Sequence, residues 1–364
     1  SGGSDKTNYY LSLGYSNQEG MIVGNTFNRL NSRLNFDHNF STRFKVGGNV
    51  AYGQLRNEAP NTGSLEGEAF STAGIGRLAF VLSPVVDPYK YDANGNRLAG
   101  LAGYNVANGA LGVGKNKQSV GFLNPAPIID LNSNKSGGSQ VQAAAFAQYD
   151  IIRGLRLKTQ YGIDNLNGEN LQFWSAFHGD GLSSGGRATN IYVNNKRWNL
   201  QNTLEFTRTL GGMHDVGALV GHEEQATERN GWGATRTSIA DPFFTTYQGN
   251  YTTIDPSGNF QLKNYLLSYF GRLNYAYNNT FFLTANLRQD EFSAFAPGNQ
   301  KGVFWGASAG LTLSELGFWK NNLGNRLNYF KIRASYGTVG NNAIGDFQSQ
   351  YLYDSGLYGA SPTF

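Results

Sequence analysis

Few side chains in this sequence of 364 residues combine the types and the spacing that catalysis or metal binding requires. Cysteine is absent, which excludes a thiolate metal site and a disulfide framework. Glu223 and Glu224 are adjacent at the end of a predicted strand, where rim charges are commoner than a paired acid and base. The four histidines lie far apart and form no set with a nucleophile. They are His38, His178, His214 and His222.

One short motif, Asp92-Ala-Asn-Gly-Asn96, faintly resembles the start of a calcium-binding loop. It lacks the later acidic ligand that such a loop needs, so an Asn-Gly turn in a tight hairpin is the better interpretation. No phosphate-binding loop, nucleophile elbow or zinc-protease motif occurs. We therefore expect a protein that is not an enzyme, with no catalytic, cofactor-binding or metal-binding residue.

The composition narrows the class of protein further. Charged residues make up only 15% of the chain and aromatic residues 14%, with 48 glycines and a net charge of +4. The many aromatic residues argue against disorder. The 29 basic and 25 acidic residues form no strong basic stripe, so nucleic-acid binding has weak support. No apolar run approaches the ~18 residues that a membrane-spanning helix needs.

Alternation of apolar and polar residues is the strongest signal in the chain. Within Lys263–Tyr277, the odd positions from Tyr265 onward carry Leu, Tyr and Gly, whereas the even positions include Asn, Ser and Arg. The run Phe281–Asp290 repeats this pattern after three turn residues, which predicts a tight hairpin. About 11 strands are predicted in this way, at 9–15, 30–40, 44–52, 141–150, 155–164, 198–206, 216–220, 263–277, 281–290, 305–312 and 330–336.

Three features favour a membrane barrel over a soluble sandwich. Most predicted strands reach the ~9–11 residues of a tilted membrane-spanning strand, beyond the ~5–6 of globular sheets. Short turns and long connections alternate along the chain, as periplasmic turns and extracellular loops do in outer-membrane barrels. The polar face is rich in Asn, Gln, Ser and Thr, which suits a water-filled lumen. We predict an all-β fold, an antiparallel transmembrane β-barrel segment with long extracellular loops, with a soluble all-β fold as the alternative.

The longest predicted connection, residues 56–138, is interpreted as a long extracellular loop insertion, because it is too long to be unstructured in a compact domain. Apolar residues near helical spacing occur within residues 67–82. They are Phe70, Ile75, Leu78, Ala79 and Leu82. This segment is either a short amphipathic helix that packs on the rim or meets a partner, or a loop that packs on itself. We favour the loop that packs on itself over a partner contact.

Several blocks of the sequence resemble the SusC/RagA-type TonB-linked (TonB-dependent) outer-membrane transporters. The first blocks are residues 1–20, Arg29-Leu-Asn-Ser-Arg-Leu-Asn-Phe-Asp-His38 and Phe44-Lys-Val-Gly-Gly-Asn-Val-Ala-Tyr52. The later blocks are Tyr269–Tyr277, Phe282–Asp290, Phe295–Asn299, Ser308–Gly310 and Lys331–Gly337. The blocks keep the order and spacing of the family. Glu291-Phe292 and Gln300-Lys301 depart from the family pattern at a predicted outer loop, so they bear on cargo or partner contacts.

The resemblance implies that residues 1–364 are the middle part of a 22-stranded barrel, and that the plug domain, the TonB box and the C-terminal strands are absent from this chain. It implies import of oligosaccharides or peptides across a bacterial outer membrane. A SusD-like surface lipoprotein would act as a lid, and TonB would act through the plug. Outer-membrane lipid would contact the apolar face. Two alternatives stay open: a plug-less porin or adhesin barrel, and a soluble β-rich carbohydrate-binding module.

The resemblance also gives the candidate site residues their context. Trp174 and Trp232 fall in predicted outer loops and are candidate contacts for cargo or lid, although we favour packing of these rings within the loops or against the lid over contact with cargo. Trp198, Trp305 and Tyr265 are predicted membrane-interface anchors. Nine charges are predicted to face the lumen, where we favour bracing of the wall or contact with the plug over selection of anionic cargo. They are Arg29, Arg33, Asp37, Arg156, Asp164, Arg272, Arg288, Asp290 and Arg333.

Overall fold

The fold is dominated by one antiparallel sheet of 13 strands in a computed structural model that describes residues 1–60, 75–81, 87–106, 124–346, 348, 356–358 and 361–363. Strands that follow each other in sequence lie side by side, except that β9 pairs only with β8. The strands are β1 (Gly2–Gly3), β2 (Thr7–Glu19), β3 (Thr26–Asn39), β4 (Phe44–Ala59), β5 (Ser133–Ile152), β6 (Leu155–Trp174), β7 (Arg187–Leu210), β8 (His214–Ile239), β9 (Tyr251–Pro256), β10 (Phe260–Tyr277), β11 (Phe281–Phe292), β12 (Lys301–Thr312) and β13 (Lys331–Gly337).

The remaining elements are short. The helices are α1 (Ile75–Val81), η1 (Gly100–Gly103), α2 (Pro125–Leu131), α3 (Asp180–Ser183), η3 (Leu313–Glu315) and α4 (Gly317–Asn322). A separate pair of strands, β14 (Gly356–Tyr358) and β15 (Ser361–Thr363), follows the main sheet in sequence. Within the described part of the chain, no helix has the length and apolar character needed to cross a membrane.

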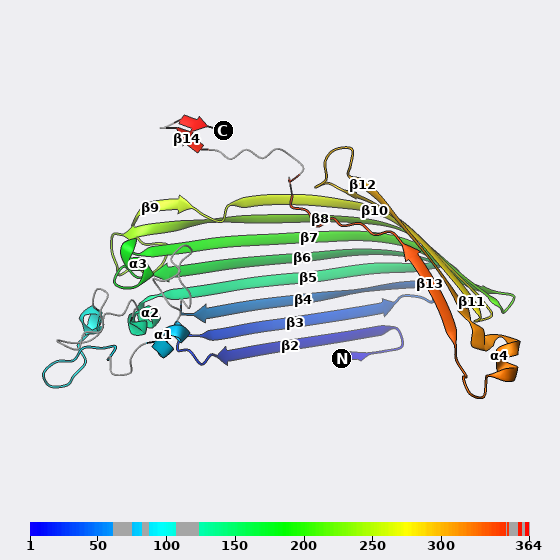
Figure 1. Ribbon diagram of the computed structural model, residues 1–364, viewed down its shortest axis with the longest axis horizontal. Helices are drawn as coiled ribbons and strands as arrows, with labels where there is room; N and C mark the ends of the chain where they lie inside the picture. The colour runs from blue at the N-terminus through cyan, green and yellow to red at the C-terminus, as the bar shows by residue number, and fades with distance from the viewer. Residues whose placement is uncertain are drawn as a thin grey trace.

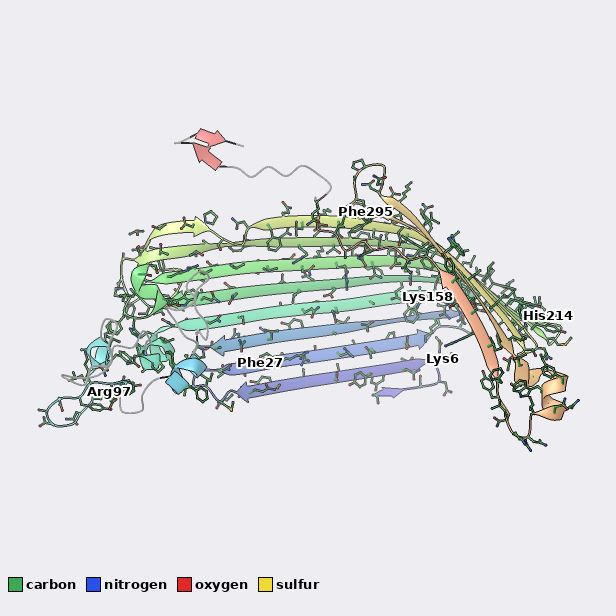
Figure 2. The ribbon with its side chains drawn as sticks, viewed as in Figure 1. Lys6, Phe27, Arg97, Lys158, His214 and Phe295 are labelled. Carbon is green, nitrogen blue, oxygen red and sulfur yellow. The ribbon has the colours of Figure 1, made fainter. Side chains whose placement is uncertain are left out.

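All eleven predicted strands are present and antiparallel, which confirms the predicted fold class. The sheet is a curved meander in which the tight turns lie at one end, together with the connection that carries α4, and the other long connections lie at the opposite end (Figure 1). Among labelled residues, His214 lies at the short-turn end and Arg97 at the long-connection end (Figure 2). Asn278 and Asn279 have φ of 45° and 53°, the left-handed backbone that a tight hairpin requires.

Several strands are much longer than the alternation predicts. β7 has 24 residues and β8 has 26, about twice the ~9–11 that a membrane crossing needs. The extra residues lie at the long-connection end, where polar residues occupy both faces and hide the period of two. The long connections are correspondingly shorter, and the stretch between β4 and β5 covers residues 60–132 rather than 56–138.

The register keeps one apolar face continuous across the sheet. We call this apolar face the outward face and the opposite one the inward face. A single cross-strand line on the outward face carries Val50, Ala143, Ile163, Trp198, Ala226 and Tyr265. The side chains on this face are largely uncovered: Leu273 is 60% exposed, Val220 58% and Leu283 43%. A water-soluble sheet would bury such a face against a second layer, and none of the described residues forms one. The apolar face therefore requires lipid or another apolar surface.

Aromatic rings border the apolar face at both ends. Toward the long connections, the Trp198 ring lies 6.1 Å from that of Tyr161 and 6.4 Å from that of Tyr265. Toward the short turns, the Phe44 ring lies 5.5 Å from Phe40 and 6.5 Å from Tyr149. Two such bands match the aromatic girdles that flank the lipid-facing surface of membrane barrels.

The only cluster of buried apolar side chains in the described chain belongs to the insertion between β4 and β5. Ile75 and Leu78 of α1 pack on Ile128 of α2. Ile22 of the β2–β3 connection also packs against this cluster, so the segment contains a short helix that packs both within the insertion and on the rim of the sheet, rather than only the loop packed on itself that the sequence favoured. The predicted helix at 67–82 begins only at Ile75, and Phe70 and Leu82 lie outside the described residues.

Asn124 joins the insertion to the connection between β6 and β7. Its side chain caps α2 by accepting from the Ala126 amide at 2.9 Å and donates to the carbonyls of Pro88 and Asn105. Its own N–H donates to Nε2 of His178 at 3.1 Å, and burial lowers the pKa of that imidazole. These contacts hold the insertion at the long-connection end of the sheet.

Candidate functional site: the polar face of the wall

The face opposite the apolar one is lined by amides, hydroxyls and charges. In each strand the residues between the outward apolar positions point to this inward face. One inward cross-strand line places Arg33, Gln142, Asp164 and Arg197 on four different strands, with Ala51 between Arg33 and Gln142. All nine charges predicted to face the lumen lie on this inward face by the strand register.

Arg288 is the centre of the densest network on the inward face. Its Nε donates to Asp290 Oδ1 at 2.7 Å, and its Nη2 donates to Glu223 Oε2 at 3.2 Å and to Ser268 Oγ at 2.8 Å. The Ser268 side chain is fully buried. The guanidinium also lies 5.5 Å from the centre of the Phe270 ring. The network ties three strands together through charge-assisted hydrogen bonds.

Three further predicted charges, Asp37, Arg156 and Asp164, pair with neighbours. Asp37 lies 3.6 Å from Lys45 Nζ, and Arg156 donates to Asp150 at 2.9 Å. The two Asp164 oxygens accept from the side-chain amides of Gln140 and Gln142 at 2.8 and 3.1 Å, and Arg197 lies 3.9 Å away. These contacts bridge adjacent strands of the wall.

Four of the predicted lumen-facing arginines have no carboxylate within ion-pair distance among the residues that the structure describes. Arg29 donates only to Asn31 Oδ1, at 2.8 Å. Arg272 lines a cavity of about 410 Å³ near the short turns, together with Glu205 and Asp215. The others are Arg33 and Arg333. These four guanidinium groups remain available to a molecule on the polar side of the wall.

The partners of the paired charges were missed by the sequence analysis. Glu223 was interpreted as a rim charge beside Glu224, yet the register points it inward to Arg288 while Glu224 points outward and accepts from the Tyr265 hydroxyl. Alternation indicates the face of a residue and not the register between strands. Only the register brings together residues that are 65 positions apart.

The prediction that Trp174 and Trp232 lie in outer loops is wrong. Trp174 is the last residue of β6, is only 6% exposed, and lies beside the Arg187 guanidinium at 5.5 Å, so it presents no ring surface. Trp232 lies inside β8 on the outward face, 60% exposed, with its ring 5.5 Å from that of Tyr192. The cause in both cases is the extension of the strands beyond the predicted bounds.

The motif at Asp92–Asn96 forms the predicted hairpin. Asp92 Oδ1 accepts from the amides of Asn94 and Asn96 at 2.9 and 2.8 Å, and Tyr91 pairs with Arg97 across the turn. The Asn96 amide hydrogen bond is the largest cause of the lowered pKa of the Asp92 carboxyl. The carboxylate therefore has a local structural partner that explains its position.

A long antiparallel sheet with an apolar outward face, two aromatic bands and a polar inward face defines a segment of the wall of a transmembrane β-barrel. No protein-family model matches the chain. The chain is 26% identical over 357 residues to TonB-dependent receptor P3 of Formosa agariphila, covering 98% of this chain and 33% of the relative. It is 25% identical over 350 residues to TonB-dependent receptor SusC of Bacteroides thetaiotaomicron, covering 95% of this chain and 33% of SusC.

Solved structures show the same fold. A chain of the RagAB peptide transporter superposes with a TM-score of 0.74 at 23% identity, covering 99% of this chain and 38% of that one. The same transporter in its 'open-open' state gives a TM-score of 0.71 at 21% identity. These likenesses confirm the resemblance to SusC/RagA-type TonB-dependent transporters found in the sequence. The chain spans about a third of the length of the curated relatives that it matches.

Proposed function

We propose that this chain forms part of the barrel of a TonB-dependent importer in a bacterial outer membrane. Large nutrients, oligosaccharides or peptides, bind on the side of the long connections and pass along the polar face of the wall. The protein binds and admits its cargo and does not alter it chemically. The wall segment contributes a rigid scaffold, and the connections contribute specificity.

The observation that supports this proposal most strongly is the two-faced wall in a chain that matches TonB-dependent receptors over 95–98% of its length. An apolar face with aromatic borders suits a bilayer, and an amide-rich face suits a hydrated passage. The long connections then face the cell exterior, because outer-membrane barrels keep their turns short on the periplasmic side. The first long strand, β2, accordingly runs outward.

The proposed partners are a SusD-like surface lipoprotein and TonB. The lipoprotein would cover the long-connection end as a lid, and TonB would act through a plug region that belongs to the rest of the protein. The likeness to SusC and to the RagAB peptide transporter supports both partners. Cargo of either chemistry, glycan or peptide, is compatible with a face lined by amides and arginines.

A deletion strain tests the function. Cells lacking the full-length gene are supplied with labelled oligosaccharide and peptide mixtures above the size that porins admit, and uptake is compared with the parent and with a strain whose TonB is inactive. We expect the deletion strain and the strain with inactive TonB to lose uptake of the same cargo class. We also expect a surface lipoprotein to co-purify with the tagged importer. Normal uptake of every large cargo in the deletion strain, or uptake that does not need TonB, would refute the proposal.

A further inference from the structure

The outward face changes chemistry beyond the aromatic band at the long-connection end. A single cross-strand line there joins Arg56, Gly137, Glu169, Tyr192 and Trp232 on five successive strands. At about 4.8 Å between neighbouring strands, this line spans roughly 19 Å. It thus presents a guanidinium, a gap, a carboxylate and two aromatic rings in a row. We call these five residues the outward row.

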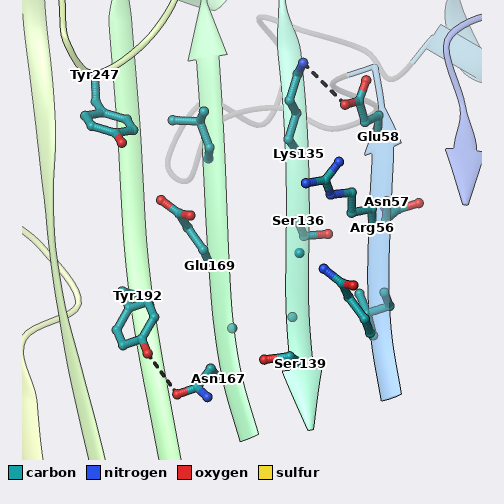
Figure 3. A pocket seen from close by; sticks show the side chains of 16 residues that line it. Arg56, Asn57, Glu58, Lys135, Ser136, Ser139, Asn167, Glu169, Tyr192 and Tyr247 are labelled. Carbon is teal, nitrogen blue, oxygen red and sulfur yellow. Dashed lines mark hydrogen bonds and ion pairs between the residues drawn. The ribbon is translucent and has the colours of Figure 1, made fainter. Parts of the chain in front are cut away.

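Gly137 makes a hollow in the outward row. A cavity of about 490 Å³ lies over it, lined by residues that include Arg56, Lys135, Glu169, Tyr192 and Tyr247 (Figure 3). A Cβ atom on Gly137 would come no closer than 3.7 Å to any neighbour, so the backbone leaves space for a side chain that is not there. The Tyr247 ring borders the hollow and lies 5.6 Å from the Arg236 guanidinium.

The polar groups around the hollow are partly organised already. Lys135 pairs with Glu58 at 3.4 Å, and the Tyr192 hydroxyl donates to Asn167 Oδ1 at 2.8 Å. Arg56 and Glu169 form no ion pair with any described residue, and both side chains are exposed. A guanidinium and a carboxylate on either side of a gap, beside a tyrosine ring, suit a ligand with many hydroxyl groups and an apolar ring face.

The position of the outward row along the strands, relative to the apolar face, indicates where such a ligand is located. Arg56 lies four residues beyond Tyr52, the last aromatic residue of β4, and Tyr192 lies six residues beyond Trp198 of the aromatic band. At about 3.3 Å per residue this is roughly 13–20 Å along the strands, beyond the apolar face. The row also points away from the polar inward face, so cargo inside the barrel cannot reach it.

We propose that the outward row binds the oligosaccharide headgroup of a glycolipid in the outer leaflet around the barrel. The tyrosine and tryptophan rings stack on sugar rings. The side chains of Arg56, Glu169 and Asn167 form hydrogen bonds with the hydroxyl groups of the sugars. The hollow at Gly137 receives one sugar ring. This inference rests on the outer-membrane placement in the proposed function, but not on import.

The test uses the full-length protein in a detergent without sugar groups. The probe is the oligosaccharide released by deacylation from the outer-membrane glycolipid of the source strain, and binding is measured by calorimetry. Gly137→Phe fills the hollow, and Gly271→Phe makes the same change on the outward face inside the apolar band, where a Cβ also meets only ordinary contacts. We expect Gly137→Phe to weaken binding at least tenfold and Gly271→Phe to leave it unchanged.

Three results would overturn the inference. One is no binding, or equal binding by both variants. Another is that a soluble glucose oligosaccharide binds as tightly as the glycolipid oligosaccharide, which would indicate a general sugar site. The same holds if the protein retains phosphatidylglycerol in lipid nanodiscs as well as it retains the glycolipid, which would indicate phosphate recognition. The third is a change in oligomeric state in Gly137→Phe with unchanged glycan binding, which would make the row a contact between copies. Uptake measured in parallel separates this inference from the import proposal, because Gly137→Phe should import cargo normally.

Discussion

The charges on the polar face divide at the residue scale into two groups with different consequences. Arg288 has three partners on neighbouring strands, and one of them, Ser268, is fully buried. Arg33 has no carboxylate partner in the described chain and is exposed. Removal of Arg288 from this half-buried network leaves its polar partners unpaired, whereas removal of a free surface charge does not.

This difference predicts unequal costs for the same substitution. Arg288→Gln should lower the free energy of unfolding by about 2 kcal/mol, since Glu223 and Asp290 lose their cation. Arg33→Gln should change it by less than about 0.5 kcal/mol. Denaturant unfolding of the full-length barrel in detergent measures both. Equal effects of the two variants would show that pairing does not stabilise the wall.

The face of each residue could be predicted from the sequence, but its partners could not. Alternation is local, so it assigns Arg288 and Asp164 to the polar side without any knowledge of the neighbouring strand. The pairing of Arg288 with Glu223 depends on the register of β10 with both β8 and β11, which tight turns set and periodicity does not.

At the scale of elements, aromatic rings that pack on glycines of the adjacent strand stabilise the pairing of neighbouring strands. The Phe270 ring of β10 lies over Gly221 of β8 so closely that a Cβ on that glycine would overlap it. The Arg288 guanidinium lies 5.5 Å from the centre of the same ring. Gly217, four residues away on the same strand and face, meets only ordinary contacts.

Paired alanine substitutions test this packing. Gly221→Ala should cost about 1–2 kcal/mol, because the ring must move away from the strand. Gly217→Ala should be neutral or stabilising by up to about 0.5 kcal/mol, because alanine restricts the unfolded chain. Thermal unfolding of the two variants, followed by the electrophoretic shift of the folded barrel, gives the comparison. A larger loss in Gly217→Ala would contradict the packing argument.

The contact between the insertion and the β6–β7 connection should depend on pH. Burial lowers the pKa of His178 below 6.5, so the unfolded connection binds a proton more readily than the folded one. The stabilisation is therefore complete above pH 6.5 and is lost as the pH falls through the lower, folded value. Protonation also removes the Nε2 acceptor of the Asn124 amide.

Hydrogen exchange of α2 checks this dependence. Protection of its amides, corrected for intrinsic rates, should fall between about pH 8 and about pH 5 in the natural protein. His178→Gln should lack this pH dependence, although its protection is lower throughout. Protection that stays constant in the natural protein, or that falls equally in the variant, would assign the effect to other groups.

The ends of the strands show where sequence-based prediction fails for elements. The stretch Asn165-Leu-Asn-Gly-Glu-Asn170 belongs to β6, yet its outward positions carry Asn165, Asn167 and Glu169 in place of apolar residues. Outside the bilayer both faces of a barrel wall meet water, so no alternation is required there. This is also why Trp174 and Trp232 were assigned to loops.

At the scale of the whole molecule, the two faces of the sheet carry opposite chemistry over eleven strands, and this asymmetry is the basis for the barrel assignment. The β11 strand presents it in adjacent residues. Leu283 points outward and is exposed, whereas Thr284 points inward and donates to Asn274 Oδ1 at 3.1 Å. Because this chain has no cysteine, single labels can be placed at either position.

Accessibility of these two neighbours is the most direct test. Leu283→Cys and Thr284→Cys are made in the full-length protein, without other reactive cysteines, labelled with a nitroxide and reconstituted into bilayers. Power-saturation spectra then compare collisions with oxygen, which concentrates in lipid, and with a water-soluble nickel complex. We expect the label at 283 to be reached mainly by oxygen and the label at 284 mainly by nickel. Nickel access at 283 equal to that at 284 would contradict a lipid-facing wall.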